Sequence, residues 1–439
     1  MASEQAFVRG KLRATATQLF SNTLVRLYVS VVILWGYTSS KVFSSSWAGD
    51  DWPNSQTPYW VKWRFGELSV KSVWNEAMYW NNEWMNGQGR FYPLQWIESR
   101  FAFSYFRELW QYKLLETSVL LISGLLLAYL IFLISDSHEI TLLLLLLLSV
   151  TVQFRRDFDP HLGYAFLVPS LLVKVLSAAI LLFYSVKSES IKLKCILSVT
   201  AGVLYFGAMS TYEYAFLLFP LLGITLIAST HKKFNTLASK GSAKNIARRY
   251  LAQSWVFLPI LVAWITYSIL VFGVLRKNAT AISGNYTLGI SWDSLPVFFK
   301  QILLPLPLNN FDTKVDLKYF ENITNVFFLL MITFIFFTIF YRNFIQRYYL
   351  SPIPNKDKKD WKEQNSPIFG FLLGFFMLLS VGFMLSLQPV WWGRADTRHG
   401  YLGVLIQEFG MSIILSYLIK HYLSGIKPHQ RFQKRGLRK

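Results

Sequence analysis

The sequence predicts an all-α, polytopic membrane protein: a transmembrane bundle of about ten helices, with short interfacial helices in its first outer loop. Hydrophobic residues make up 53% of the 439 residues and charged residues only 15%, whereas a soluble domain carries roughly a quarter charged residues. Apolar runs of about 20 residues recur along the whole chain, and a helix of that length can cross the hydrocarbon core of a bilayer. We therefore expect a single transmembrane domain over residues 1–439.

The apolar runs give the expected positions of the spans. They lie near 24–43, 113–134, 139–154, 162–185, 194–211, 213–230, 254–275, 322–341, 367–387 and 401–419. The third run is short, and the fourth contains Pro169 and Lys174. Either of these two segments could therefore be re-entrant instead of crossing the membrane.

The distribution of charge predicts the orientation of the bundle. The formal net charge is +20. With a cytoplasmic N-terminus, most Lys and Arg residues fall in inner loops and in a basic tail at 420–439, as the positive-inside rule predicts. This placement favours contact with anionic membrane lipids over a nucleic-acid partner. We expect a multi-pass protein of a bacterial inner membrane with this orientation.

The first outer loop, 44–112, is long and rich in tryptophan. It holds more than half of the 16 tryptophans, interleaved with charged residues. Such a segment favours short amphipathic helices that lie in the membrane interface. The alternative is aromatic anchoring without a further role. A second outer loop is expected at 276–321.

Five polar segments fall on the outer side in this topology. They are 49–52, 87–96, 155–161, 210–214 and 391–401. Because they converge on one face of the bundle, we predict a single site that opens there. The alternative is that each segment caps a helix end at the level of the lipid headgroups.

The first segment carries two adjacent acids, Asp50 and Asp51. Adjacent side chains in an extended segment point in opposite directions, so we expect the two acids to have different roles. We assign Asp51 as a general base and Asp50 as the residue that orients it or binds a metal. The alternative is a helix N-cap ahead of Pro53.

A D-x-D-x-H pattern follows in the third polar segment. Its members, Asp157, Asp159 and His161, would share one face of an extended chain. Carboxylates together with an imidazole could hold a divalent cation. Alternatively, the acids pair with Arg155 and Arg156 at the headgroup level.

The last polar segment presents two arginines at helical spacing. Arg394 and Arg398 are four residues apart, so one helix face would carry both, and His399 follows directly. Two guanidinium groups can clamp a phosphate through bidentate hydrogen bonds. Arg90 could join them from the first loop. The alternative ligand is a lipid headgroup, which requires the same chemistry but no catalysis.

Two further groups of charged residues belong to the expected spans. Glu213, beside Tyr212, begins a span at the outer boundary and is a candidate for the acceptor side of the site. Lys174 and Glu408 lie deeper. A charge at bilayer depth costs about 2.5–3.5 kcal/mol on insertion scales, so we expect Lys174 to pair with Glu408 or another acid.

A first span followed by the paired acids Asp50 and Asp51, in a long outer loop with interfacial helices, resembles the C-type (GT-C) membrane glycosyltransferases. The resemblance is best over residues 1–230. It implies transfer of a hexose or pentose from a polyprenyl-phosphate carrier to a glycan, lipid or protein acceptor on the outer face. It also implies that one of these acids is the catalytic acid/base, and that Asp157 and Asp159 match the second acidic loop of the family. Many members carry a large soluble C-terminal domain that this sequence does not show, which leaves the acceptor open.

Two other classes compete with this interpretation. A lipid-linked oligosaccharide polymerase or ligase would also gather arginines on the outer face, with less dependence on an acid pair in the first loop. A transporter or flippase would need broken helices and polar residues near the midplane. Lys174, Glu408 and a few prolines are the main features of the sequence that fit such a path.

Overall fold

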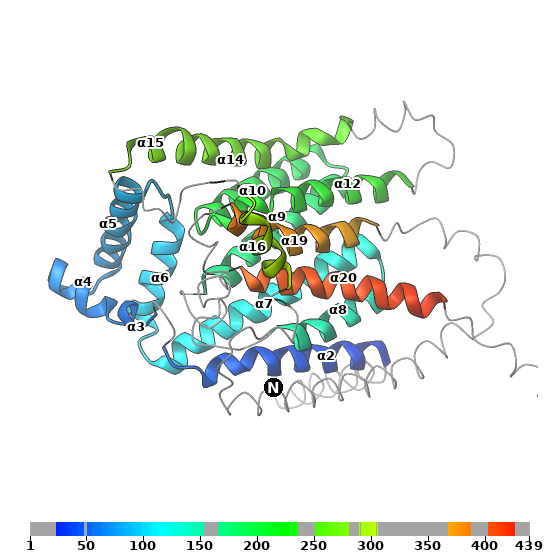
Figure 1. Ribbon diagram of the computed structural model, residues 1–439, viewed down its shortest axis with the longest axis horizontal. Helices are drawn as coiled ribbons and strands as arrows, with labels where there is room; N and C mark the ends of the chain where they lie inside the picture. Colours follow the sequence, from blue (N-terminus) through cyan, green and yellow to red (C-terminus); the bar gives the residue numbers. More distant parts are fainter. Residues whose placement is uncertain are drawn as a thin grey trace, which may run out of the picture.

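The computed structural model describes a bundle of helices. The described residues are 23–47, 51–152, 166–235, 251–280, 289, 291–303, 305, 368–387 and 403–425. Every secondary-structure element within these ranges is a helix (Figure 1). The all-α class is therefore confirmed for this part of the chain.

The long helices lie side by side, and shorter ones connect them. The bundle contains α2 (Thr23–Ser39), α7 (Leu109–Ser135), α8 (His138–Thr151), α9 (Leu167–Lys187), α10 (Ile191–Met209), α11 (Tyr214–Leu217), α12 (Phe219–Asn235), α14 (Leu258–Ser268), α19 (Ile368–Ser386) and α20 (Val404–Gly425). The others are η1 (Ser40–Ser44), α3 (Asp51–Asn54), α4 (Thr57–Phe65), α5 (Val70–Gln88), α6 (Pro93–Tyr105), η2 (Trp255–Phe257), the π-helical η3 (Ile269–Leu275), α15 (Arg276–Asn278) and α16 (Ser294–Leu303).

Six helices in the described residues are long and apolar enough to cross a membrane. They are Leu109–Ser135, Leu167–Lys187, Ile191–Met209, Tyr214–Phe234, Leu251–Asn278 and Ile368–Ser386. The apolar helix α8 has only 14 residues, and the expected span at 322–341 lies outside the described residues. The structure thus fits a multi-pass membrane protein, while the count of about ten spans stays a prediction.

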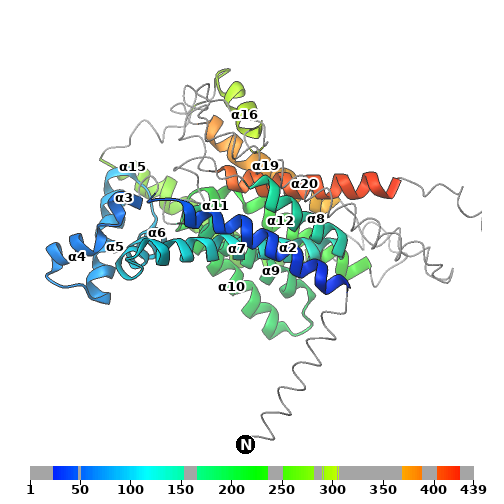
Figure 2. The same cartoon turned by 90° about the horizontal axis from the view of Figure 1, so that it is seen from below.

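Helices α3 to α6 form a layer across one end of the bundle, which we call the capped end (Figures 1 and 2). At this end α6 leads into α7, and the N–H of Leu94 in α6 donates to the carbonyl of Ser210 at the end of α10 (3.2 Å). The expected first outer loop is therefore helical over most of its length. The position of this layer in a membrane interface stays a prediction.

Close packing of small and large side chains fixes the helices against one another. Trp35 of α2 is fully buried, and its ring packs directly against Gly124 of α7. A Cβ added to Gly124 would lie only 2.5 Å from Nε1 of Trp35, so no larger residue fits there without a shift. Helices α19 and α20 approach in the same way, because a Cβ on Gly410 would lie 2.6 Å from the carbonyl oxygen of Gly374. Such contacts are the usual basis of helix association in membranes.

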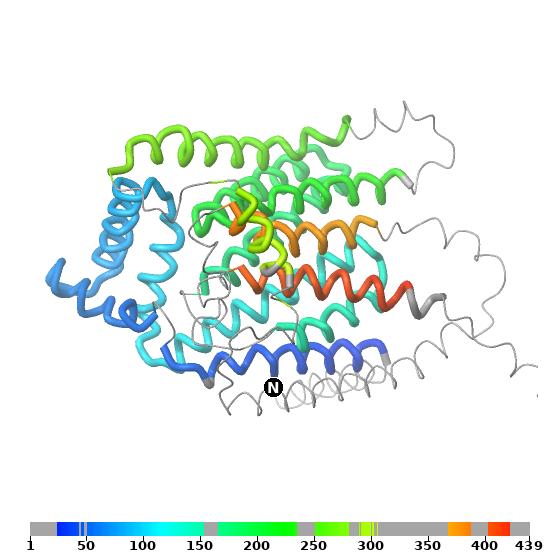
Figure 3. Tube along the Cα trace, viewed as in Figure 1, coloured from blue at the N-terminus to red at the C-terminus, as the bar shows by residue number. Residues whose placement is uncertain are grey.

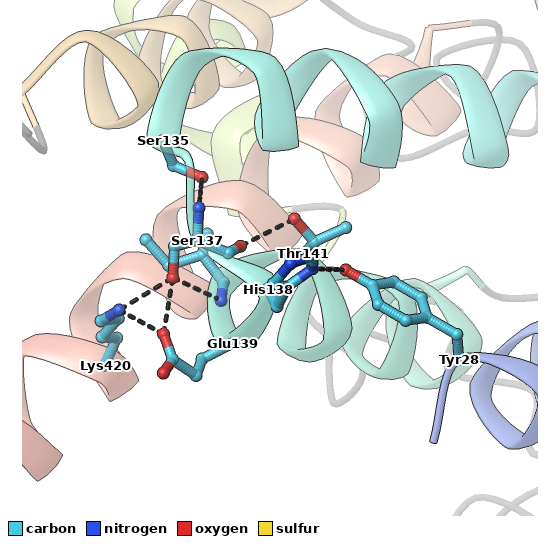
Figure 4. A network of polar contacts seen from close by, with 8 residues as sticks. Tyr28, Ser135, Ser137, His138, Glu139, Thr141 and Lys420 are labelled. Carbon is cyan, nitrogen blue, oxygen red and sulfur yellow. Dashed lines mark hydrogen bonds and ion pairs between the residues drawn. The ribbon is translucent and has the colours of Figure 1, made fainter. Parts of the chain in front are cut away.

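A polar network closes the bundle at the end opposite the layer. Figure 3 shows α8 beside both the first and the last described helices, α2 and α20. At the start of α8, Lys420 of α20 contacts Glu139 (Nζ to Oε2, 2.6 Å) and donates to Ser137 (2.8 Å), as Figure 4 shows. Tyr28 of α2 pairs with Nδ1 of His138 (2.9 Å). These contacts join three helices distant in sequence.

Candidate functional site

Asp51 lies at the capped end as the first residue of α3. Its side chain is fully buried and accepts a hydrogen bond from the hydroxyl of Tyr112 (2.9 Å), which comes 61 residues later near the start of α7. Asp51 begins a short helix with Pro53 two residues further on, so its position fits both a helix start and a functional acid. The contact with Tyr112 links it to the bundle.

A buried ion pair stands next to this contact. Nζ of Lys113 lies 2.7 Å from Oε2 of Glu116 one turn further along α7, and both side chains have zero exposure. The carboxyl group of Glu116 interacts electrostatically with that of Asp51, and both carboxyl groups act on the Tyr112 hydroxyl. The fold therefore gathers two carboxyl groups, one ammonium and one phenol, which we call the Asp51 cluster.

Aromatic rings pack against Tyr112 of the Asp51 cluster. The ring of Tyr112 stacks on Phe103 at 4.6 Å between centroids, and it lies 5.0 Å from Trp47 and 6.4 Å from Phe166. These rings come from three separate segments of the chain besides α7 itself. An apolar wall of this kind lowers the local dielectric constant, and every charge interaction inside it becomes stronger.

A second polar cluster, the Glu213 cluster, contains three residues that the sequence analysis expects in the site: Arg90, Tyr212 and Glu213. Buried Arg90 donates from Nη2 to Oε2 of Glu213 (3.2 Å) and from Nε to the hydroxyl of Tyr92 (2.5 Å). Arg276 approaches the same carboxylate, with 3.7 Å between Nη2 and Oε1. Burial raises the pKa of Tyr92 well above its ordinary value, so its phenol stays protonated at neutral pH and accepts from Arg90 with an oxygen lone pair.

Tyr212, also expected in the site, belongs to this second cluster. The guanidinium of Arg90 lies 4.5 Å from the ring centroid of Tyr92 and 5.7 Å from that of Tyr212. The two rings are 5.6 Å apart. The structure thus brings Arg90, Tyr212 and Glu213 together, and cation–π contacts help hold the guanidinium in place.

Lys174 pairs with a different acid from the one named first in the sequence analysis. Its Nζ lies 2.6 Å from Oε1 of Glu98 in α6, and the hydroxyl of Ser170 donates to Oε2 of the same carboxylate (2.6 Å). The expected ion pair is present, and Glu98 takes the place proposed for Glu408. The contact ties α9 to the layer at the capped end.

The layer itself is held by a buried arginine. Arg100 of α6 donates to Oδ1 of Asn54 (2.9 Å) and to the hydroxyl of Thr57 (2.8 Å), and its guanidinium lies 4.9 Å from the Trp96 ring centroid. Burial lowers the pKa of Arg100 to about 10, so it remains charged at neutral pH. These contacts fix α3, and with it Asp51, against α6.

Several residues expected in the site lie outside the described residues. They are Asp50, Asp157, Asp159, His161, Arg394, Arg398 and His399. In the described part of the chain, no group of three or more His, Cys, Asp or Glu side chains could hold a metal ion. The proposed metal ligands are not in that part, so the metal-site prediction stays open.

The sequence analysis missed Tyr112, Lys113, Glu116 and Arg276. The signal for the first three was a Lys and a Glu one turn apart inside an apolar run, which marks an interior pair. The expected span begins at 113, whereas the helix begins at Leu109, so these residues lie within its first turns. Comparison of the chain with protein-family models, with curated proteins and with solved structures gives no match.

Proposed function

We propose that this protein is a membrane glycosyltransferase, which moves a sugar from a polyprenyl-phosphate carrier to an acceptor at the capped end. The observation that supports this proposal is the Asp51 cluster. It places a carboxylate at the boundary between an apolar bundle and a polar helical layer, where a lipid-borne donor and a water-borne acceptor can meet.

In this proposal Asp51 is the general base. It takes the proton from an acceptor hydroxyl while the hydroxyl oxygen attacks the anomeric carbon of the sugar. The bond from that carbon to the phosphate oxygen breaks, and the carrier leaves as a polyprenyl phosphate. In-line attack of this kind inverts the anomeric centre.

The neighbours of Asp51 position it for this step. Tyr112 donates a hydrogen bond to Oδ2 of Asp51, which fixes the orientation of the base. Glu116, which pairs with Lys113 in the same helix, also interacts electrostatically with the phenol of Tyr112. Because Asp51 is buried in this conformation, the acceptor reaches it only after the residues that cover it move.

The departing phosphate needs positive charge. We assign this role to Arg394, Arg398 and His399, together with Arg90. A guanidinium aimed at the developing charge on the phosphate stabilises the transition state more than the ground state. Arg90 is already oriented by Glu213 and Tyr92, so its place is fixed before the donor binds.

The experiment compares Asp51→Asn with Asp293→Asn in purified protein supplied with polyprenyl-phosphate-linked hexoses and pentoses. Asparagine keeps the size of the side chain but removes basicity, so the Asp51 variant should lose about 10²–10⁴-fold in kcat. Asp293 is exposed on the segment before α16 and serves as the matched control.

Donor binding should survive in the Asp51 variant, because the base contacts the acceptor. If the Asp51→Asn protein folds and keeps nearly full activity, Asp51 is not the general base. A polymerase or ligase predicts the opposite ranking, with arginine variants much more damaging than the acid variant. A transporter predicts flux of the lipid or sugar across proteoliposomes without transfer.

The position of the embedded charges favours an enzyme over a transporter. Lys113 and Glu116 lie within the first two turns of α7, close to the capped end. Lys174 pairs with Glu98, which belongs to the layer at that end. A transport path would require such groups near the midplane, whereas both ion pairs lie toward one face.

A further inference from the structure

Arg276 gives the Glu213 cluster an excess of positive charge. Arg90 and Arg276 both approach the single carboxylate of Glu213, at 3.2 Å and 3.7 Å. Two guanidinium groups against one carboxylate leave one net positive charge among these three side chains. A cluster of this composition attracts an anion.

The guanidinium of Arg276 has donors to spare. Its separation from Glu213, 3.7 Å, satisfies an ion pair but is too long for a hydrogen bond. Among the described residues, none accepts a hydrogen bond from the buried Nε of Arg276. The side chain is nevertheless 19% exposed, so a ligand can reach it. The planar fork of an arginine fits two oxygens of a phosphate.

The backbone holds Arg276 in this place. Gly89 ends α5 with a φ of +65°, and a Cβ there would lie 2.8 Å from Cα of Arg276. Only glycine allows the two backbones to come so close. The N–H of Thr280 also donates to the carbonyl of Asn86 (3.0 Å). The π-helical turn Ile269–Leu275 stands directly before Arg276, and π-helical turns occur frequently at functional sites.

The surroundings of Arg276 indicate the kind of anion. Arg276 lies near the end of the helix Leu251–Asn278. Only 22% of the most apolar stretch of this helix is buried inside the protein. Large apolar side chains on it, such as Ile265, Ile269 and Phe272, are exposed, and in a membrane they face lipid tails. An anion that arrives at Arg276 along this face is the headgroup of a lipid.

We propose that Arg276 and Arg90 bind the phosphate group of a polyprenyl phosphate, whose chain lies along the exposed face of α14 and η3. Glu213 is a positioning residue that holds both guanidinium groups. The inference rests on the proposed function in identifying this lipid as the sugar carrier. The binding site itself requires no sugar transfer.

The test measures binding of a fluorescent polyprenyl phosphate to the full-length protein in phosphatidylcholine nanodiscs. Arg276→Gln should weaken binding about tenfold or more, because a charge-assisted hydrogen bond is lost. Lys277→Gln is the matched control: it removes the same charge from the next, exposed residue and should leave the affinity unchanged. Glu213→Gln should strengthen binding, since it removes the competing negative charge while keeping an acceptor for the arginines.

Three competitors identify the ligand. Unlabelled polyprenyl phosphate should displace the probe, whereas uncharged polyprenol should not. Displacement by inorganic phosphate alone, at equal strength, would reassign the site to a free anion and overturn the lipid proposal. If wild type, Arg276→Gln and Glu213→Gln bind the fluorescent polyprenyl phosphate with equal affinity, these residues do not form a phosphate site.

This binding experiment is independent of catalysis. If the phosphate site is right and the glycosyltransferase proposal is wrong, the lipid binds in an Arg276-dependent way but the wild-type protein transfers no sugar from it. If only the phosphate site is wrong, Asp51→Asn loses about 10²–10⁴-fold in kcat, while Arg276→Gln binds the lipid and transfers the sugar as wild type does.

Discussion

Replacing Lys113 with Met should destabilise the protein strongly and in a pH-dependent way. The pair with Glu116 has 2.7 Å between charged atoms and zero exposure on both sides. At an effective dielectric constant of about 20, the Coulomb attraction at this distance is about 6 kcal/mol. Part of it offsets the desolvation of both groups, and removing one partner of a buried pair typically costs about 3–5 kcal/mol.

The pH dependence follows from the carboxyl group that the substitution leaves behind. An unpaired, buried Glu116 can become neutral by taking up a proton, which at pH 7 costs about 3.7 kcal/mol for a carboxyl of ordinary pKa. At pH 5 this cost is only about 1 kcal/mol. The folded variant then holds a proton that the unfolded chain releases, so its stability should fall as pH rises from 5 to 7.

Thermal unfolding in detergent at pH 5 and pH 7 checks this reasoning. Lys113→Met should unfold well below wild type at pH 7, and the gap should narrow at pH 5. The double variant Lys113→Met with Glu116→Gln carries no buried charge at these positions and should show a gap that does not depend on pH. A single variant as stable as wild type, or a gap equal at both pH values, would refute a buried charged pair.

Three further predictions follow from the ion pairs and the charge pattern. Replacing Arg394 or Arg398 with Lys keeps the charge but loses bidentate geometry, so the apparent KM for the polyprenyl-phosphate sugar should rise about tenfold; an unchanged KM in both variants excludes them from the donor site. Lys174→Met should lower the midpoint of thermal unfolding but leave kcat per folded molecule nearly unchanged, since Lys174 pairs with Glu98 and joins α9 to α6; normal expression with lost activity would place Lys174 in the site instead. Cysteine labelling at 236–242 should report the cytoplasm and at 280–290 the outside, and the reverse pattern would invert the topology.

The candidate site was only partly predictable, because its contacts join residues far apart in the chain. Asp51, Arg90, Tyr212 and Glu213 were visible as polar residues at the ends of apolar runs. Their grouping was not: Arg90 meets Glu213 across 123 residues. The described contacts divide them into two groups, Asp51 with Tyr112 and the other three around Glu213, and the single site that the sequence predicts stays a prediction.

Sequence alone determined the all-α class and the run of apolar helices, because helix formation and membrane insertion depend on residues within about 20 positions of one another. It also determined that Lys174 would have an acidic partner, since an unpaired charge in a bilayer is too costly. Only the tertiary structure decided that this partner is Glu98, that Tyr112 and Glu116 accompany Asp51, and that Arg276 joins Arg90 on Glu213. These choices depend on which helices pack side by side, and a local pattern along the chain does not contain that information.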